Sequence, residues 1–258
     1  MQIHMLRHAT LVIQIGELRI LFDPMLSPAG AMPPVANASV QLPIPMVELP
    51  IEKYELRYML DHVDAVLVSH THRDHWDAQA VELLPKEVPI FCQPSDAAAI
   101  EQAEFTQVNP VAQSLTWRNL TIQRTSGRHG TGEIGAAMGE VSGFVLSASN
   151  EPKLYLAGDT IWCPEVEQAL AEHQPDVVVL HAGAAQFLTG DPITMTADDV
   201  VQVCRAAPNA RIIAVHMETV NHCLLTRDQL RERLAAEGLL AQVAIPADGE
   251  LIVLGDRS

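Results

Sequence analysis

Five apolar runs spread along this chain each lead into an aspartate or a histidine. They are "LRILF" before Asp23, "AVLVS" before His70, "LTIQRTSGR" before His129, "KLYLAG" before Asp159 and "RIIAV" before His216. Open α/β sheets place their sites beyond the carboxyl ends of their strands. If these strands converge, five separate segments bring Asp and His to one edge. One coincidence of this kind means little, but five favour a built site.

Paired apolar runs predict antiparallel strands in the first part of the chain. The runs "ATLVIQI" and "LRILF" flank Gly16-Glu17, and further hairpins are expected to turn at Arg118-Asn119 and at Asn150-Glu151-Pro152. Later, helices are expected near 164–172 and 197–206, with strands between the helices. This pattern predicts sheets covered by helices in a layered α/β or α+β domain.

Residues 24–53 interrupt the pattern with seven prolines and no clear hydrophobic period. A loop of this length inside a compact domain is more often a functional lid or binding loop than a disordered insert. Its many apolar residues need a surface to pack against. We therefore predict a single domain over residues 1–258, with a proline-rich lid or binding loop at about 24–53.

The net charge limits the kinds of partner that the protein can bind, and the cysteines indicate its cellular compartment. The formal charge is −16 at pH 7, and so acidic a surface repels phosphate backbones and anionic lipid. The chain has no apolar run of about 18 residues, the length that a membrane helix needs. Its first residues lack the apolar core of a signal peptide, and its scattered cysteines indicate reduced thiols. We expect a cytoplasmic protein acting on a small molecule, without nucleic acid or membrane partners; the sequence carries no signal for oligomeric state.

The stretch "HTHRDH" has the spacing of metal ligands. His70 and His72, two residues apart in extended backbone, point their imidazoles to the same side. Two nitrogens on one side can grip one metal, and a third ligand from elsewhere leaves a position open for water, as in catalytic sites. His129 is the natural third ligand. A solvated, histidine-rich loop is the competing interpretation, and the spacing disfavours it.

The next residues of the same stretch offer a second site. Asp74 and His75, together with His216, supply a carboxylate and two imidazoles, and Asp159 has two oxygens that can bridge two ions. Two cations that share a water lower its pKa towards neutrality and hold hydroxide at pH 7. The same ions polarise a carbonyl or phosphoryl oxygen under attack.

Several further residues are candidates for supporting roles. Asp23 is expected to accept a hydrogen bond from a ligand histidine or an amide, although Asp-Pro is also an ordinary turn signal. His181 ends an apolar run, so it is either a substrate-facing or proton-shuttling residue or a buried imidazole bonded to backbone. His222 either binds substrate or protonates a leaving group, or it caps the following helix. Asp74 or His181 is expected to manage the proton. His8, at the edge of the first hairpin, either lies near the site or has a structural role, and the structural role is favoured.

These motifs together resemble a known family. "FDP", "HTHRDH", "RHG", "YLAGDT" and "AVH" occur in the order found in the metallo-β-lactamase superfamily and span residues 23–216. The combination of HxHxDH with GDT is very specific. The resemblance implies a four-layer αββα sandwich with a dinuclear site at one edge. It implies His70, His72 and His129 on one ion, Asp74, His75 and His216 on the other, and Asp159 between them.

Differences between this sequence and other branches of the superfamily narrow the choice of subgroup. Redox di-iron members carry Glu where this chain has His72, and the commonest zinc β-lactamases use a Cys where it has Asp159. "HATLVIQIGELRILFDP" and "HMETVNH" are similar to the ascorbate-6-phosphate-lactonase-like group of metal-dependent hydrolases. The phosphate-binding residues of that lactonase are not identifiable in this chain.

The expected activity is hydrolysis with two divalent metal ions. Metal-bound hydroxide would attack an ester-like bond, a lactone or a related carbonyl compound. The alternatives are a phosphodiesterase-type hydrolase of the same fold, a non-hydrolytic metal-bearing sensor or binding protein, and a mononuclear iron oxidation as in persulfide dioxygenases. Histidine-rich ligation suits Zn²⁺, Mn²⁺ or Fe²⁺; Zn²⁺ is the default, and Mn²⁺ is what the lactonase likeness implies.

Overall fold

A computed structural model describes residues 1–255, and its strands form two sheets. The first sheet has the order β14 (Leu251–Val253), β1 (Gln2–Arg7), β2 (Thr10–Ile15), β3 (Leu18–Phe22), β4 (Ala65–Val68), β5 (Ile90–Cys92) and β6 (Val108–Pro110). The second has the order β13 (Val243–Ala244), β12 (Arg211–Val215), β11 (Val177–His181), β10 (Leu154–Leu156), β9 (Ser142–Ser147), β8 (Leu120–Ser126) and β7 (Ser114–Trp117).

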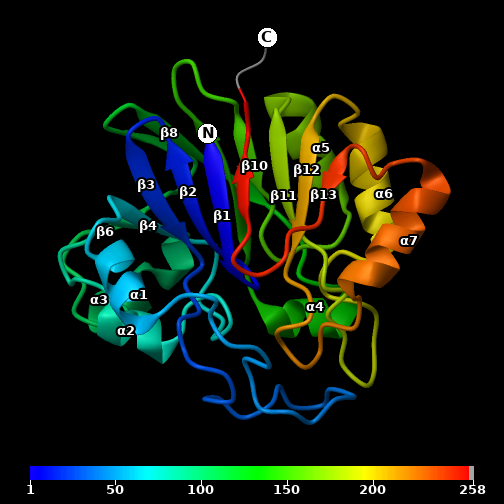
Figure 1. Cartoon of the computed structure of the whole chain (residues 1–258), viewed down its shortest axis with the longest axis horizontal. Helices are drawn as coiled ribbons and strands as arrows, with labels where there is room; N and C mark the ends of the chain where they lie inside the picture. The colour runs from blue at the N-terminus through cyan, green and yellow to red at the C-terminus, as the bar shows by residue number, and fades with distance from the viewer. Residues whose placement is uncertain (256–258) are drawn as a thin grey trace.

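Helices cover the outer face of each sheet (Figure 1). The first sheet packs against α1 (Lys53–Leu60), α2 (Ala78–Leu83) and α3 (Ala97–Gln102), which follows a short 3₁₀ turn at Pro94–Asp96. The second packs against α5 (Pro164–His173), α6 (Ala197–Ala206) and α7 (Arg227–Glu237). The remaining helix, α4 (Gly132–Met138), lies at the lower edge of the sheets. The predicted four-layer αββα sandwich is confirmed.

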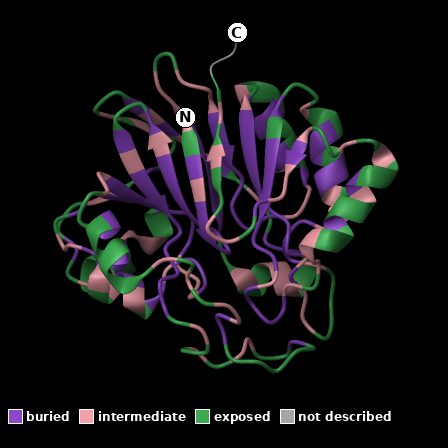
Figure 2. Ribbon diagram, viewed as in Figure 1, coloured by how far each residue is buried: buried purple, intermediate pink, exposed green. Residues whose placement is uncertain are grey.

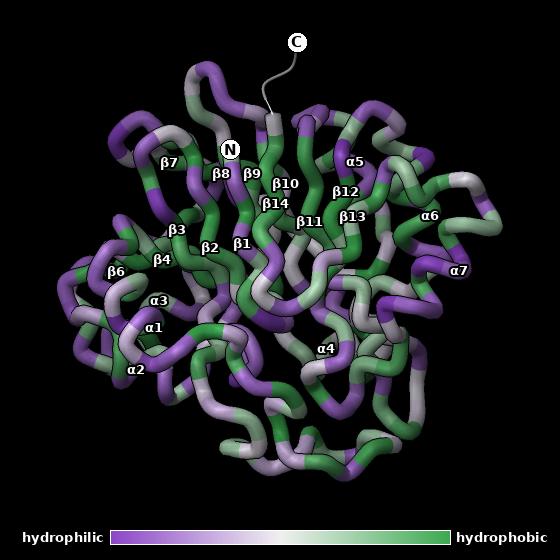
Figure 3. Tube along the Cα trace, in the orientation of Figure 1, coloured by the Kyte–Doolittle hydropathy of each residue, from purple (hydrophilic) through white to green (hydrophobic). Residues whose placement is uncertain are grey.

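Most strands near the middle of the sandwich are apolar on both faces, which explains their uninterrupted hydrophobic runs. In β4, Ala65 and Leu67 enter the core between the sheets, while Val66 and Val68 pack under the helices. Figure 2 shows the strands as the buried part of the molecule and the helices exposed on their outer sides. Figure 3 shows the same strands as the most hydrophobic segments. Burial on two faces therefore leaves these strands without an alternation of polar and apolar residues.

The three predicted hairpins are present. β2 pairs with β3, β7 with β8, and β9 with β10, all antiparallel. Gly16, Arg118 and Asn150 lie in these turns with positive φ angles, as tight turns require. Within residues 1–255, no helix is long and apolar enough to cross a membrane.

The 24–53 segment runs below the sheets in Figure 1 and is tied down at its base. The buried Arg7 guanidinium donates to the carbonyl oxygens of Met25 and Ser27 on the outgoing leg, at 2.9 and 2.8 Å, and to that of Val47 on the returning leg, at 2.8 Å. Further along, Met32 and Ile44 pair in an antiparallel bridge. The segment is therefore a hydrogen-bonded extension of the domain.

The strands that lead into the candidate ligands run in the same direction within each sheet. β3 and β4 are parallel, and so are β10, β11 and β12. Their carboxyl ends lie at the edge of the sandwich that the 24–53 segment borders (Figure 1). This arrangement brings candidate ligands that are far apart in the sequence to the same edge of the sandwich.

Candidate metal centre

The first group of candidate ligands is the trio predicted from the HxH spacing. One ring nitrogen each of His70, His72 and His129 lies within 4.8 Å of the others. His70 Nε2 and His72 Nδ1 are 2.9 Å apart. His70 and His129 are buried, whereas His72 is partly exposed. Three converging imidazole nitrogens could hold a metal ion and leave a coordination position for water.

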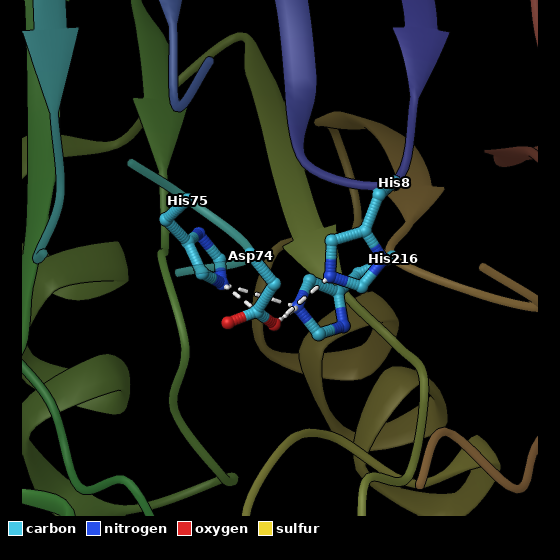
Figure 4. A group of neighbouring side chains, drawn as sticks. All are labelled: His8, Asp74, His75 and His216. Carbon is cyan, nitrogen blue, oxygen red and sulfur yellow. Dashed lines mark hydrogen bonds and ion pairs between the residues drawn. The ribbon is translucent and has the colours of Figure 1, made fainter. Parts of the chain in front are cut away.

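The second group contains Asp74, His75 and His216, also as predicted, and adds His8. Figure 4 shows the Asp74 carboxylate pointing between the three imidazoles. Asp74 Oδ2 lies 3.6 Å from His75 Nε2 and 3.7 Å from His216 Nε2, and these two nitrogens are 3.2 Å apart. His8 approaches the same carboxylate oxygen at 3.2 Å.

Asp159 lies between the two groups. Its Oδ2 is 3.5 Å from His129 Nε2 and 3.2 Å from His75 Nε2, and its Oδ1 is 3.3 Å from His216 Nε2. The turn that presents it depends on Gly158, which has a φ of +71° and where a Cβ would lie 2.5 Å from the Ser142 carbonyl oxygen. The glycine of "YLAGDT" is thus required by the backbone that aims the carboxylate.

Outer partners contact the Nδ1 atoms of four candidate ligand histidines, and two of these partners, a carboxylate and a carbonyl, can only accept a hydrogen bond. His75 Nδ1 donates to Asp23 Oδ2 at 2.8 Å, and His129 Nδ1 donates to the Ile193 carbonyl at 2.8 Å. His70 Nδ1 lies 3.0 Å from Ser69 Oγ, and His216 Nδ1 lies 3.6 Å from Cys223 Sγ. An imidazole whose Nδ1 carries the proton presents the lone pair of Nε2. All four Nε2 atoms face the centre, so these residues fit a metal.

Asp23 makes more contacts than a turn residue needs. Besides His75, it accepts hydrogen bonds from the Ser69 amide, 2.7 Å from its Oδ1, and from Ser69 Oγ, 2.6 Å from its Oδ2. It is fully buried. The carboxylate thereby links the end of β3 to the start of the HxHxDH stretch and orients His75.

Burial keeps two of the ligand histidines neutral. It lowers the pKa of His70 and of His216 well below the usual value, although the Asp159 carboxylate opposes the shift in both. Metals bind the neutral form of imidazole. Two buried rings that stay unprotonated near pH 7 are therefore ready ligands.

The carboxylates of Asp74 and Asp159 stay charged because of their neighbours, against the effect of burial. Burial alone would raise the pKa of Asp74 and of Asp159, but neighbouring imidazoles outweigh it and hold both pKa values well below the usual range. Burial disfavours protonation of His75, yet the carboxylates of Asp159, Asp74 and Asp23 raise its pKa well above the usual value. Without a metal, a protonated His75 imidazole balances the negative charge of these buried carboxylates.

His181 and His222, the two further predicted histidines, both lie at this edge. His181 Nδ1 donates to Asp159 Oδ1 at 2.7 Å, and its ring stacks on that of His216 at 4.9 Å. His181 Nε2 and His222 Nδ1 are buried and have no hydrogen-bond partner within residues 1–255. His222 lies 5.8 Å from Phe187 between ring centroids and lines the cavity above the centre. It caps no helix, since Thr226 begins α7.

His8 is the residue that the sequence undervalued. It occupies the tight turn between β1 and β2, with a φ of +58°. Its carbonyl accepts a hydrogen bond from the His216 amide at 3.0 Å, and its ring lies 3.6 Å from the His216 ring. Burial lowers the pKa of His8 to about 4. His8 therefore contacts two members of the second group, Asp74 through its side chain and His216 through both its ring and its backbone.

A cavity of about 210 Å³ opens onto the centre. Its polar floor consists of His72, Arg73, Asp74, His129, Asp159 and His222, and its apolar walls of Val35, Ala36, Met138, Phe187 and Ile193. Sites for drug-sized ligands usually measure about 300–1,000 Å³. The cavity therefore suits a small, partly apolar molecule that reaches both groups of ligands.

Comparison with known proteins gives relatives that match nearly the whole chain. The model of the β-lactamase superfamily domain matches residues 18–217. The UPF0173 protein YddR of Bacillus subtilis is 36% identical over 97% of this chain and 98% of its own length. The UPF0173 metal-dependent hydrolase Ta0764 of Thermoplasma acidophilum is 25% identical over 90% of this chain and 89% of its own.

Two solved structures have nearly the same fold. A possible metal-dependent hydrolase from Veillonella parvula is 37% identical, with a TM-score of 0.94 over 98% of this chain and 99% of that one. An isothiocyanate hydrolase from Delia radicum gut bacteria is 36% identical, with a TM-score of 0.93 over the same shares. The chain belongs to the β-lactamase superfamily, among the metallo-β-lactamase-fold proteins that include the UPF0173 family.

Proposed function

We propose that this protein is a cytoplasmic, dinuclear metal-dependent hydrolase. The observation that carries the proposal is the pair of candidate ligand groups, buried except for His72, with Asp159 between them beneath a cavity open to small molecules. Relatives and structural neighbours described as metal-dependent hydrolases support the reaction class. The free cysteines are consistent with a reducing compartment.

In this proposal each group of ligands holds one ion. His70, His72 and His129 hold the first, and Asp74, His75 and His216 hold the second, with Asp159 shared. Bound divalent ions supply Lewis acidity and lower the pKa of a water towards neutrality. Zn²⁺ is the first expectation, while Mn²⁺ and Fe²⁺ suit the same mixture of imidazole and carboxylate.

The other polar residues at the cavity position the substrate and its protons. Burial lowers the pKa of His222, so its imidazole is a neutral hydrogen-bond donor facing the substrate. His181 holds Asp159 through a 2.7 Å hydrogen bond. The side chain of Asp74 keeps 13% of its surface exposed and reaches the cavity, where it can accept a proton from an attacking water.

The substrate class is an electrophilic carbon that carries a small apolar group. The isothiocyanate hydrolase neighbour makes an isothiocyanate the first candidate: water adds to the central carbon, and the products are an amine and carbonyl sulfide. A lactone or similar ester, which presents an electrophilic carbonyl to the same attack, is the second candidate. A phosphodiester fits less well, because Arg73 is the only cation among the described residues that line the cavity.

A substrate and metal screen tests the proposal. Purified protein is assayed for metal content, then with benzyl isothiocyanate, a γ-lactone and a phosphodiester, in parallel with His72→Ala and the control His62→Ala. His62 is exposed, and its side chain makes one hydrogen bond among residues 1–255, to the Tyr58 carbonyl. We expect amine release by the wild type and the control, and loss of metal and turnover in His72→Ala.

Two results would count against it. Full metal content and turnover in His72→Ala would refute the ligand assignment. A wild type that binds two ions but hydrolyses none of the three substrates would favour the sensor or binding protein instead.

A further inference from the structure

A buried side-chain amide makes three hydrogen bonds to one wall of the cavity. Asn221 is 1% exposed. Its Oδ1 accepts a hydrogen bond from the Val35 amide at 2.8 Å, and its Nδ2 donates to the carbonyls of Val35 and Val40 at 3.2 and 2.6 Å. One side chain thus satisfies three main-chain groups of the 35–40 stretch, which belongs to the proline-rich segment.

The same stretch is fixed from other sides. The Leu188 amide donates to the Asn37 carbonyl at 2.7 Å, and the Met46 amide donates to the Thr219 carbonyl at 2.7 Å. Beneath it, Ile44 packs with Val220 in a small apolar cluster. The segment is therefore a docked wall, which favours the binding loop over the mobile lid.

This wall determines the shape of the cavity. Val35 and Ala36 line it together with Phe187 and with His222, the neighbour of Asn221 in sequence. The segment from His216 to His222 therefore connects a candidate metal ligand to the wall. A shift of the wall would change the width of the cavity without moving any ligand.

Building on the proposed function, we propose that Asn221 is a positioning residue that sets the size of the organic group accepted beside the reacting carbon. A cavity of about 150 Å³ accommodates a benzene molecule. The volume here, about 210 Å³, suits a group no larger than one aromatic ring or a short alkyl chain. Without the Asn221 amide, Val35 and Ala36 lose their anchor, and the cavity admits larger groups.

Two measurements on Asn221→Ala test this. Hydrogen exchange of the 32–44 segment reports on the wall without any substrate. The ratio of kcat/KM for benzyl over naphthylmethyl isothiocyanate reports on size selection, for which a shaped apolar pocket gives about 10- to 200-fold per misfitted group. The matched control is Asn109→Ala, which removes an asparagine that also bonds main-chain carbonyls but lies in β6, at the outer edge of the first sheet.

We expect faster exchange over 32–44 in Asn221→Ala, unchanged metal content, and a selectivity ratio that falls at least about tenfold towards one. Asn109→Ala should match the wild type in all three. Val35→Ala, which shortens the wall but keeps the main-chain hydrogen bonds, should lower the ratio with wild-type exchange, and it replaces Asn221→Ala in the selectivity assay if that variant does not fold.

Unchanged exchange in Asn221→Ala would overturn the anchoring role. Faster exchange with an unchanged ratio would overturn the selection of substrates by this wall. If the wild type hydrolyses neither isothiocyanate, the substrate class of the proposed function fails, and the exchange measurement alone decides whether Asn221 holds the wall.

Discussion

Replacing Asp23 by Asn tests how the outer partners control the metal centre. The substitution keeps the shape of the side chain but replaces one oxygen with an NH₂ group. The Ser69 amide donates to Oδ1 of Asp23, so that position must remain an oxygen. The NH₂ group therefore replaces Oδ2, which lies 2.8 Å from His75 Nδ1.

This exchange reverses the tautomer of His75. An NH₂ group only donates, so His75 Nδ1 must give up its proton and accept. The proton then moves to Nε2, the atom that faces Asp159 and His216 at 3.2 Å each. A protonated Nε2 has no lone pair for a metal, and the second ion loses a ligand.

Outer partners of ligand histidines are worth about 10- to 100-fold in metal affinity. At about 1.4 kcal/mol per tenfold, this range corresponds to roughly 1.4–2.8 kcal/mol. We expect the upper half of the range, because Asp23 is fully buried and is the only partner of His75 Nδ1 within residues 1–255. Chelator competition would show one ion bound as in the wild type and the other more weakly, with turnover reduced in parallel.

The control is Asp77→Asn. Asp77 is also buried, but it accepts hydrogen bonds from the amides of Ser27 and Ala80 and caps α2. Its loss should lower the melting temperature and leave metal affinity unchanged. Wild-type affinity for both ions in Asp23→Asn would refute the reasoning about the tautomer.

Three further substitutions have distinct expected outcomes. His8→Phe keeps a ring against His216 but removes the nitrogen that faces the second group, so metal affinity should fall about 10- to 100-fold by chelator competition. Arg7→Met leaves the Met25, Ser27 and Val47 carbonyls without their donor. A loss of about 3 kcal/mol in unfolding free energy would lower Tm by roughly 6–12 °C. An unchanged Tm would contradict the role of Arg7 in holding the 24–53 segment. Gly158→Ala should cost about 1–3 kcal/mol in unfolding free energy and reduce bound metal, whereas Gly139→Ala, also at positive φ but with open space around it, should keep full metal content.

The strands that carry the candidate ligands were predictable because they are buried on both faces. Double burial demands continuous apolar runs, and such a run ends where the chain leaves the core. His181, the last residue of β11, follows four buried valines and leucines in this way. The positions of Asp23, His70 and Asp159 could be inferred for the same reason.

Other elements give no such signal. β1 went unpredicted because polar residues interrupt it, with His4 near its middle and Arg7 at its end. α2 is 6 residues long and has one buried residue, and α4 has none, so neither shows a helical hydrophobic period. His8 follows β1 in a short turn, where no long apolar run points to it.

The proline-rich segment shows a different limit. Its composition predicts a functional loop, but its conformation depends on Arg7 and Asn221, which are far from it in sequence. Side chains that bond to main-chain groups across such separations leave no pattern in the local sequence. The number and placement of prolines therefore indicated a lid or binding loop without identifying which residues hold it.

Anomalous diffraction from crystals of the metal-loaded protein would test the central proposal most directly. Two peaks are predicted in each chain, one within bonding distance of His70, His72 and His129, and one within bonding distance of His75 and His216, with Asp159 between them. A single peak, or peaks away from both groups, would contradict the dinuclear centre.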